Sequence, residues 1–144
     1  MRTNPERRYL LERVDEAAVV QLYAEEFSAL PLRERILVWH LSRAALAGRD
    51  IFYDQRYAHN LEMRAVLEAI LTHDEDVDAP VAAEIRRYTK LFWLNSGPYN
   101  NITARKFLLH LAKADFAAAA RAAAGRGARF PQREGETLEA MIAD

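Results

Sequence analysis

The feature that most constrains this chain is an apolar stripe at helical spacing near its middle. Within residues 57–72, apolar side chains recur at i, i+3, i+4, i+7 and i+8, and these are Met63, Val66, Leu67, Ile70 and Leu71. Side chains at this spacing share one face of an α-helix. The segment therefore predicts a helix over residues 57–72 that packs this face against a core.

Two further helices are expected upstream of this stripe. Asp15 is placed to cap a helix over residues 17–29. Pro31 suits the first turn of another helix over residues 32–47, because a first-turn N–H has no helical partner in any case. Since residues 32–47 are apolar on most sides, we expect this helix to be the buried central one, with His40 a hydrogen-bonded core residue.

Capping and breaking residues define the segments after the stripe. Asp78 is placed to cap a fourth helix, which must end before Gly97-Pro98 because proline disfavours helical geometry in the preceding residue. Residues 96–106 are expected to form an ordered loop or a short extended segment.

The last third of the chain predicts two more helices. An alanine-rich helix is expected over residues 115–124, because alanine is the best helix former. A final short helix is expected to start at Thr137 and to be still running at Asp144, which indicates a domain of a longer protein. Together these segments predict an all-α fold, a single helical domain over residues 1–144 with about five to six helices and no strong β signal.

Composition excludes several function classes. Twenty basic residues face twenty-one acidic ones, so charge argues for neither a nucleic-acid partner nor an anionic membrane. The absence of cysteine excludes disulfides and thiolate zinc sites. Residues 1–8 carry no apolar stretch typical of a secretory signal, and no apolar run is long enough for a bilayer, so we expect a cytoplasmic protein.

The histidines do not form a metal-binding motif. None of His40, His59, His73 and His110 begins the His-Glu-x-x-His pattern that places two ligands on one helical face. His59 and Glu62 are three residues apart and would share a face of a helix, but two ligands do not make a site. No serine has a histidine and an acid at suggestive spacing, so we assign no catalytic and no metal-binding residue.

The acidic run at residues 73–78 resembles the start of a calcium loop only superficially. A calcium loop needs glycine at its sixth position and glutamate at its twelfth, and these positions hold Ala79 and Ile85. We interpret the run as an exposed acidic turn before a helix N-terminus, where negative charge is favourable.

The segment Asn95-Ser96-Gly97-Pro98-Tyr99-Asn100-Asn101 allows two interpretations. Amide side chains both donate and accept hydrogen bonds, and tyrosine offers a flat apolar surface with a polar tip, so the segment suits the binding of a peptide. It also suits an ordinary glycine–proline turn, in which the asparagines cap neighbouring helices or adopt left-handed geometry. The residues alone leave both open.

Three stretches together carry a resemblance to a known family. They are WHLSRAA at 39–45, continuing through GRDIFYDQ at 48–55; GPYNN at 97–101, leading into Lys106-Phe107; and GARFP at 127–131. They resemble the N-terminal region of the dipeptidyl peptidase III family of zinc metallopeptidases, in its bacterial and plant-like branch. Two departures are a missing tyrosine in the third stretch and a loop shorter than in the animal enzymes.

The resemblance implies a longer, two-lobed enzyme that removes dipeptides from short peptides. The zinc of that family is held by a His-Glu-x-x-Gly-His helix and a glutamate in the other lobe, so no zinc ligand or catalytic residue carries over to this chain. It implies that the remaining lobe is a partner and that five loop residues line the peptide site: Gly97, Tyr99, Asn100, Asn101 and Phe107. The alternative is a stand-alone helical interaction module without enzymatic activity.

Overall fold

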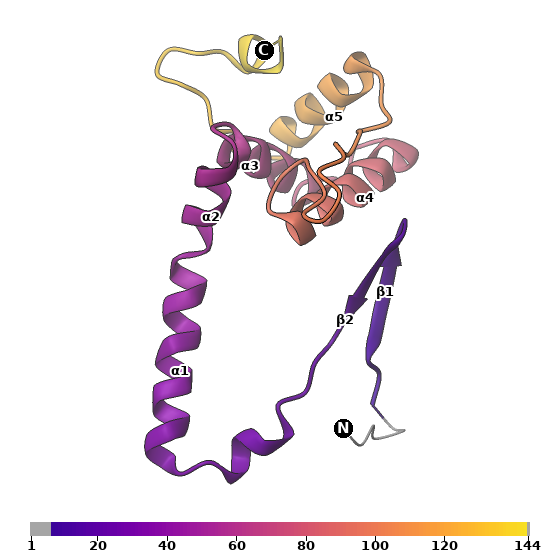
Figure 1. Cartoon of the computed structure of the whole chain (residues 1–144). Helices are drawn as coiled ribbons and strands as arrows, with labels where there is room; N and C mark the ends of the chain where they lie inside the picture. Colours follow the sequence, from indigo (N-terminus) through magenta and orange to yellow (C-terminus); the bar gives the residue numbers. More distant parts are fainter. Residues whose placement is uncertain (1–6, 144) are drawn as a thin grey trace. The chain divides into compact units, whose positions relative to one another are not determined.

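The computed structural model describes residues 7–143. Contacts divide the chain into two compact units, Met1–Ile51 and Phe52–Asp144, and each is described by itself (Figure 1). The expected single domain over residues 1–144 stays a prediction. The start of the region searched for a secretory signal, residues 1–6, lies outside the described residues, and so does Asp144, where the last helix is expected to be still running.

The first unit begins with a β-hairpin, where a helix over residues 17–29 was expected. Strand β1 (Leu10–Val14) pairs antiparallel with β2 (Ala17–Val20), and a bulge falls between Leu10 and Glu12. Asp15 has a φ of 51° and occupies the two-residue turn instead of capping a helix. Aspartate tolerates this left-handed conformation, which short hairpin loops require. The prediction of a helix at this point is therefore wrong.

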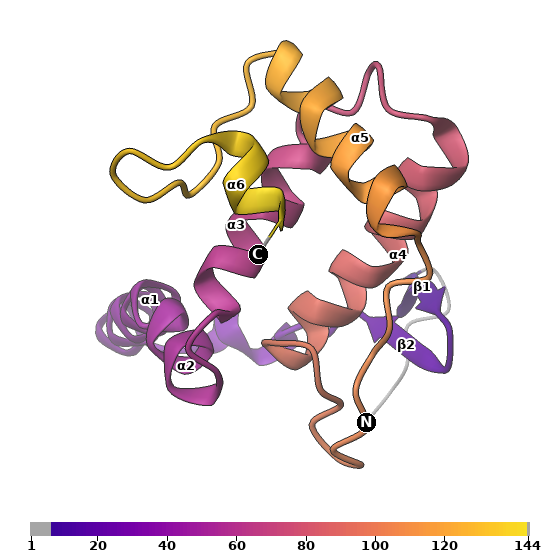
Figure 2. The same cartoon turned by 90° about the horizontal axis from the view of Figure 1, so that it is seen from above.

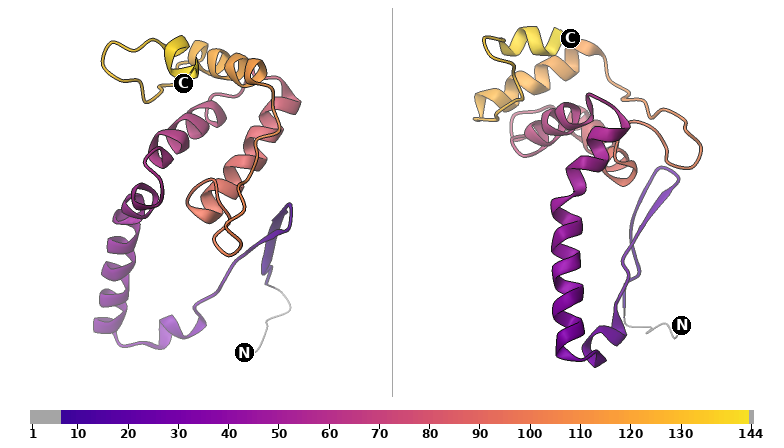
Figure 3. Two further views of the ribbon diagram at one scale, coloured as in Figure 1. Left: turned by 45° about the horizontal axis from the view of Figure 1, so that its top comes forward. Right: turned by 60° about the vertical axis from the view of Figure 1, so that its left-hand side comes forward.

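A 3-10 helix, η1 (Glu25–Ala29), leads to the long helix α1 (Leu32–Ala47), and Pro31 immediately precedes α1 as expected. No residue of α1 is buried, so the prediction of a buried central helix is wrong. His40 is likewise exposed, with its ring edge-on to that of Trp39 at 4.8 Å. Figure 3 shows α1 as a long, straight helix. The sequence predicts its helicity but not its surroundings.

The second unit is helical. After Gly48 the chain enters α2 (Arg49–Arg56), which crosses the boundary between the units, and continues into α3 (Asn60–Leu71), α4 (Ala79–Asn95), α5 (Lys113–Gly125) and α6 (Leu138–Ala143). Helices α3, α4 and α5 pack against one another, and α6 contacts α5 (Figure 2). The stripe helix, the capped fourth helix, the alanine-rich helix and the final helix are thus confirmed within a residue or a few.

Local signals explain where these helices begin. The Asp78 carboxylate accepts a hydrogen bond from Val81 N at 3.3 Å, and a proline stands in the first turn of α4. Thr137 Oγ1 accepts from Ala140 N at 3.2 Å at the start of α6. Both contacts satisfy first-turn N–H groups that have no partner inside the helix.

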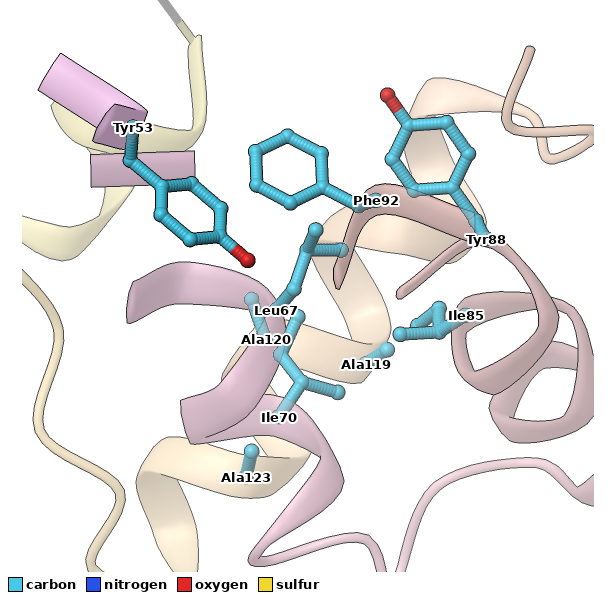
Figure 4. Packing of buried hydrophobic residues seen from close by; sticks show 9 residues of the cluster. All are labelled: Tyr53, Leu67, Ile70, Ile85, Tyr88, Phe92, Ala119, Ala120 and Ala123. Atoms are coloured by element: carbon cyan, nitrogen blue, oxygen red, sulfur yellow. The ribbon is translucent and has the colours of Figure 1, made fainter. Parts of the chain in front are cut away.

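The core of the second unit lies between α3, α4 and α5 (Figure 4). Ile70, Ile85 and Phe92 are at most 1% exposed, and the rings of Tyr53 and Phe92 stack with centroids 6.0 Å apart. The alanines of α5 bury small side chains, so its backbone can approach α3 and α4 closely. The mostly helical architecture agrees with the all-α prediction. None of the helices within residues 7–143 has the length and apolar character needed to cross a membrane.

Candidate functional site

The segment from the last residue of α4 to Phe107, residues 95–107, is called here the asparagine loop. In Figure 3 the chain leaves the end of α4, closes a loop and returns towards α5. Ser96 has a φ of 52°, and Gly97 N donates to Phe92 O at 3.0 Å, which satisfies a carbonyl at the end of the helix. The left-handed residue at the C-cap turns the chain sharply into the loop.

The side chain of Asn60, at the start of α3, forms a hydrogen bond with the first part of the loop. Its side chain is 1% exposed, and Nδ2 donates to Tyr53 O at 3.0 Å and to Ser96 O at 3.2 Å. The same amide lies against Gly97, where an added Cβ would approach Asn60 Nδ2 to 2.8 Å. Sequence reasoning missed Asn60, although it falls three residues before Met63 and seven before Leu67 and so continues the buried stripe.

Hydrogen bonds within the loop hold its shape. Tyr99 and Lys106 form an isolated antiparallel bridge, and Phe107 N donates to Pro98 O at 2.8 Å. Asn100 Oδ1 accepts from Ile102 N and from Thr103 N, both at 2.9 Å. This pattern is a side-chain-closed turn, typical of asparagine. The prediction of an ordered loop or a short extended segment is confirmed as an ordered loop, with the Tyr99–Lys106 bridge within it.

A second asparagine, Asn95, fixes the tip of the loop. Its Nδ2 donates to Leu91 O at 2.9 Å and its Oδ1 accepts from Asn101 N at 3.0 Å. Arg56 Nη1 donates to Asn95 O at 3.0 Å and also to Asn101 Oδ1. The end of α2, the end of α4 and the loop tip are therefore joined in one hydrogen-bond network.

An ion pair on α4 fixes the exit of the loop. Arg87 Nε and Glu84 Oε2 are 2.7 Å apart, Arg87 Nη2 donates to Leu108 O at 2.9 Å, and His110 N donates to Glu84 Oε1 at 2.7 Å. The hydrogen bond from Arg87 lowers the pKa of Glu84; burial opposes this, and the His110 N–H adds to it. Glu84 is therefore held as a carboxylate at neutral pH.

The five predicted substrate-binding residues lie in one loop but in different environments. Gly97 is buried, Phe107 is half-buried against the core, and the Asn100 side-chain oxygen is engaged in the turn. Tyr99 is 41% exposed and Asn101 is exposed. Burial raises the pKa of the neighbouring Tyr88, with Arg87 opposing and Tyr99 adding to the shift. Tyr99 and Asn101 are therefore the most exposed of the five, and contact of any of the five with a peptide stays a prediction.

The other polar clusters of the sequence have structural partners. His59 Nδ1 lies 3.4 Å from Glu62 Oε2, both about half exposed. In the acidic run, Asp74 and Asp76 form ion pairs with Arg86 and Arg126, while Asp78 caps α4. Within residues 7–143, no three histidine or carboxylate side chains are placed to share a metal ion.

Neither a protein-family model nor a curated protein matches this chain.

Proposed function

We propose that this chain is the non-catalytic helical N-terminal domain of a dipeptidyl-peptidase-III-like zinc metallopeptidase and forms one wall of its peptide-binding cleft. The zinc and the catalytic residues belong to the remaining lobe, so this chain contributes a surface for that lobe and contacts to the peptide. Two features support the proposal: the exposed apolar surface of α1 and the rigid polar loop after α4.

The exposed apolar surface of α1 is the main support for the proposal. Its large apolar residues are more than 40% exposed on every side of the helix, and they are Leu32, Ile36, Leu37, Val38, Trp39, Leu41 and Leu46. Large apolar residues on every side of a helix are typical of a helix inside a larger core, because apolar surface left in water costs roughly 25 cal/mol per Å². Further polypeptide that covers α1 is what a lobe of a larger enzyme would supply.

The asparagine loop supports the second half of the proposal. Its hydrogen bonds hold the loop in one shape before any ligand arrives, while Tyr99 and Asn101 project into solvent. A pre-formed loop binds a peptide with a smaller loss of conformational entropy than a mobile one. Exposed amide and phenol groups suit a ligand that presents backbone carbonyls and N–H groups.

The test starts with the gene. The proposal expects the reading frame to continue past Asp144 into a His-Glu-x-x-Gly-His motif, and the whole gene product to release dipeptides from short peptides in a zinc-dependent manner. The control replaces the glutamate of that motif with glutamine and should abolish release. A reading frame that stops at Asp144, or a folded whole product without this activity, contradicts the proposal.

The alternative is a stand-alone interaction module, and the same α1 surface favours it. Here the partner is an amphipathic helix of another protein that lies along α1. This function predicts that no peptidase sequence follows in the gene and that a partner helix covers Leu37 and Leu41. The two proposals are distinguished by the sequence that follows Asp144 in the gene. An assay of the isolated chain would not distinguish them, because both expect it to have no activity.

A further inference from the structure

We propose that Arg56 is a positioning residue that aims the side-chain amide of Asn101, so that its N–H groups donate to a backbone carbonyl oxygen of an extended peptide. The inference rests on the proposed function, since it takes a peptide as the ligand of the asparagine loop. Arg56 lies on α2, outside the asparagine loop, and the group recognised on the peptide is a backbone carbonyl oxygen.

The orientation of the Asn101 amide follows from the chemistry of arginine. Arg56 Nη1 contacts Asn101 Oδ1 and donates to Asn95 O at 3.0 Å. A guanidinium has only donors, so the oxygen of Asn101, and not its nitrogen, must face Arg56. The NH₂ group is thereby directed away from Arg56, on an exposed side chain. Arg56 is itself placed over the ring of Phe52, with Cζ 5.4 Å from the ring centroid.

The backbone of Asn101 is fixed as firmly as its side chain. Asn101 N donates to Asn95 Oδ1 at 3.0 Å, and Asn95 Nδ2 donates to Leu91 O at 2.9 Å, with Asn95 only 9% exposed. Two hydrogen bonds therefore hold Asn101. Asn95 of α4 binds its backbone N–H, and Arg56 of α2 binds its side-chain oxygen. Groups fixed before binding lose little further freedom when a ligand arrives.

Most of the backbone donors of residues 100–107 are used internally, and the Asn101 NH₂ group remains as an exposed donor for a peptide carbonyl. The N–H groups with acceptors inside the loop or its base are those of Asn100, Asn101, Ile102, Thr103, Ala104, Arg105 and Phe107. In the part of the chain that the structure describes, the Asn101 NH₂ group donates to no protein acceptor. Tyr99, in the same loop and 41% exposed, offers an apolar surface for the peptide itself.

The experiment uses the whole gene product and three variants. Asn101→Asp keeps an oxygen for Arg56 and the backbone N–H for Asn95, but it has no side-chain N–H to donate. We expect its KM for a short peptide to rise about five- to tenfold with kcat within about twofold, the pattern for loss of one uniform binding contact. Arg56→Met should raise KM similarly, and the double variant should be no worse than the weaker-binding single variant, because both changes remove one contact.

The matched control is Arg105→Met, which removes a positive charge from the same loop without touching Asn101, and it should leave KM unchanged. Melting temperatures separate positioning from stability: all variants should melt within a few degrees of the wild type, about 2–4 °C. An unchanged KM in a folded Asn101→Asp enzyme overturns the inference. A fall in melting temperature large enough to explain the rise in KM also overturns it. A folded whole gene product without peptidase activity overturns the proposed function and this inference together, whereas an active enzyme with unchanged KM overturns the inference alone.

Discussion

Gly97 lies directly against the side chain of Asn60, so that a Cβ on Gly97 would stand 2.8 Å from Asn60 Nδ2 and 3.1 Å from its Oδ1. Gly97 also has a φ of +146°, a conformation that L side chains rarely adopt. Because Asn60 donates to Tyr53 O and Ser96 O, this contact lies where α2, α3 and the asparagine loop meet.

Replacement of Gly97 by alanine should therefore lower the free energy of unfolding by about 2–4 kcal/mol, from backbone strain plus the clash with Asn60. Urea denaturation followed by circular dichroism measures the loss. The matched control is Gly127→Ala, where φ is +96° but nothing lies within 4 Å of an added Cβ. Gly127→Ala should cost only the strain, about 1–2 kcal/mol; equal losses at both positions would contradict the packing against Asn60.

Removal of the cap of α4 should have a smaller and separable effect. Asp78 accepts from Val81 N at 3.3 Å, and its replacement by alanine leaves that donor without a helical partner. We expect Asp78→Ala to lower the free energy of unfolding by about 1 kcal/mol, and Asp78→Ser to lose a fraction of that because serine also caps. Thermal unfolding of the two variants provides the comparison. A serine variant as unstable as the alanine variant would show that Asp78 does not act as a cap.

Those elements whose signals are local were predictable from the sequence. The stripe that ends at Leu71, the cap at Asp78 and the break at Gly97-Pro98 each depend on residues within a few positions, and α3 and α4 begin and end near them. Asp15 shows the limit of this reasoning, since aspartate serves equally as an N-cap and as a left-handed turn residue. The β-branched pair Val19-Val20, which favours a strand, was the signal that distinguishes the two.

Contacts distant in sequence were not predictable. The apolar composition of α1 predicts a buried helix, but what covers a helix is not encoded in its own residues, and in this chain α1 is exposed. In the candidate site, the amide and tyrosine side chains of residues 95–101 are what made Tyr99 and Asn101 candidate binding residues. The hydrogen bonds that hold the loop come from Asn60, Asn95 and Arg56. They depend on how α2, α3 and α4 pack against one another, because that packing sets which donor faces which acceptor.

The Glu84 carboxylate should make stability depend on pH in the acidic range. Its hydrogen bond with Arg87 lowers its pKa in the folded state, so its contribution is present above its ordinary pKa and is lost as pH falls through the folded-state value. We expect Glu84→Gln to be less stable than wild type by about 1–2 kcal/mol at pH 7, with a smaller difference below about pH 4. Chemical denaturation across pH measures this difference.

The control for this pH dependence is Glu134→Gln, an exposed glutamate, which should change stability by less than about 0.5 kcal/mol at every pH. A Glu84→Gln deficit that stays constant from pH 7 to about pH 3 would mean that the carboxylate charge is not what holds the loop exit to α4.

Exposure of α1 leads to a prediction about the chain by itself. Leu37 and Leu41 are one helical turn apart and are 58% and 59% exposed, so the isolated chain should self-associate through this face as its concentration rises. The double variant Leu37→Gln/Leu41→Gln should shift sedimentation towards the monomer while it changes the free energy of unfolding by no more than about 0.5 kcal/mol. Leu67→Gln is the contrasting variant, because Leu67 is 3% exposed in the core of the second unit, and it should cost about 3 kcal/mol or more. If the α1 double variant were as unstable as Leu67→Gln, α1 would be packed inside this chain, and the need for further polypeptide to cover it would disappear.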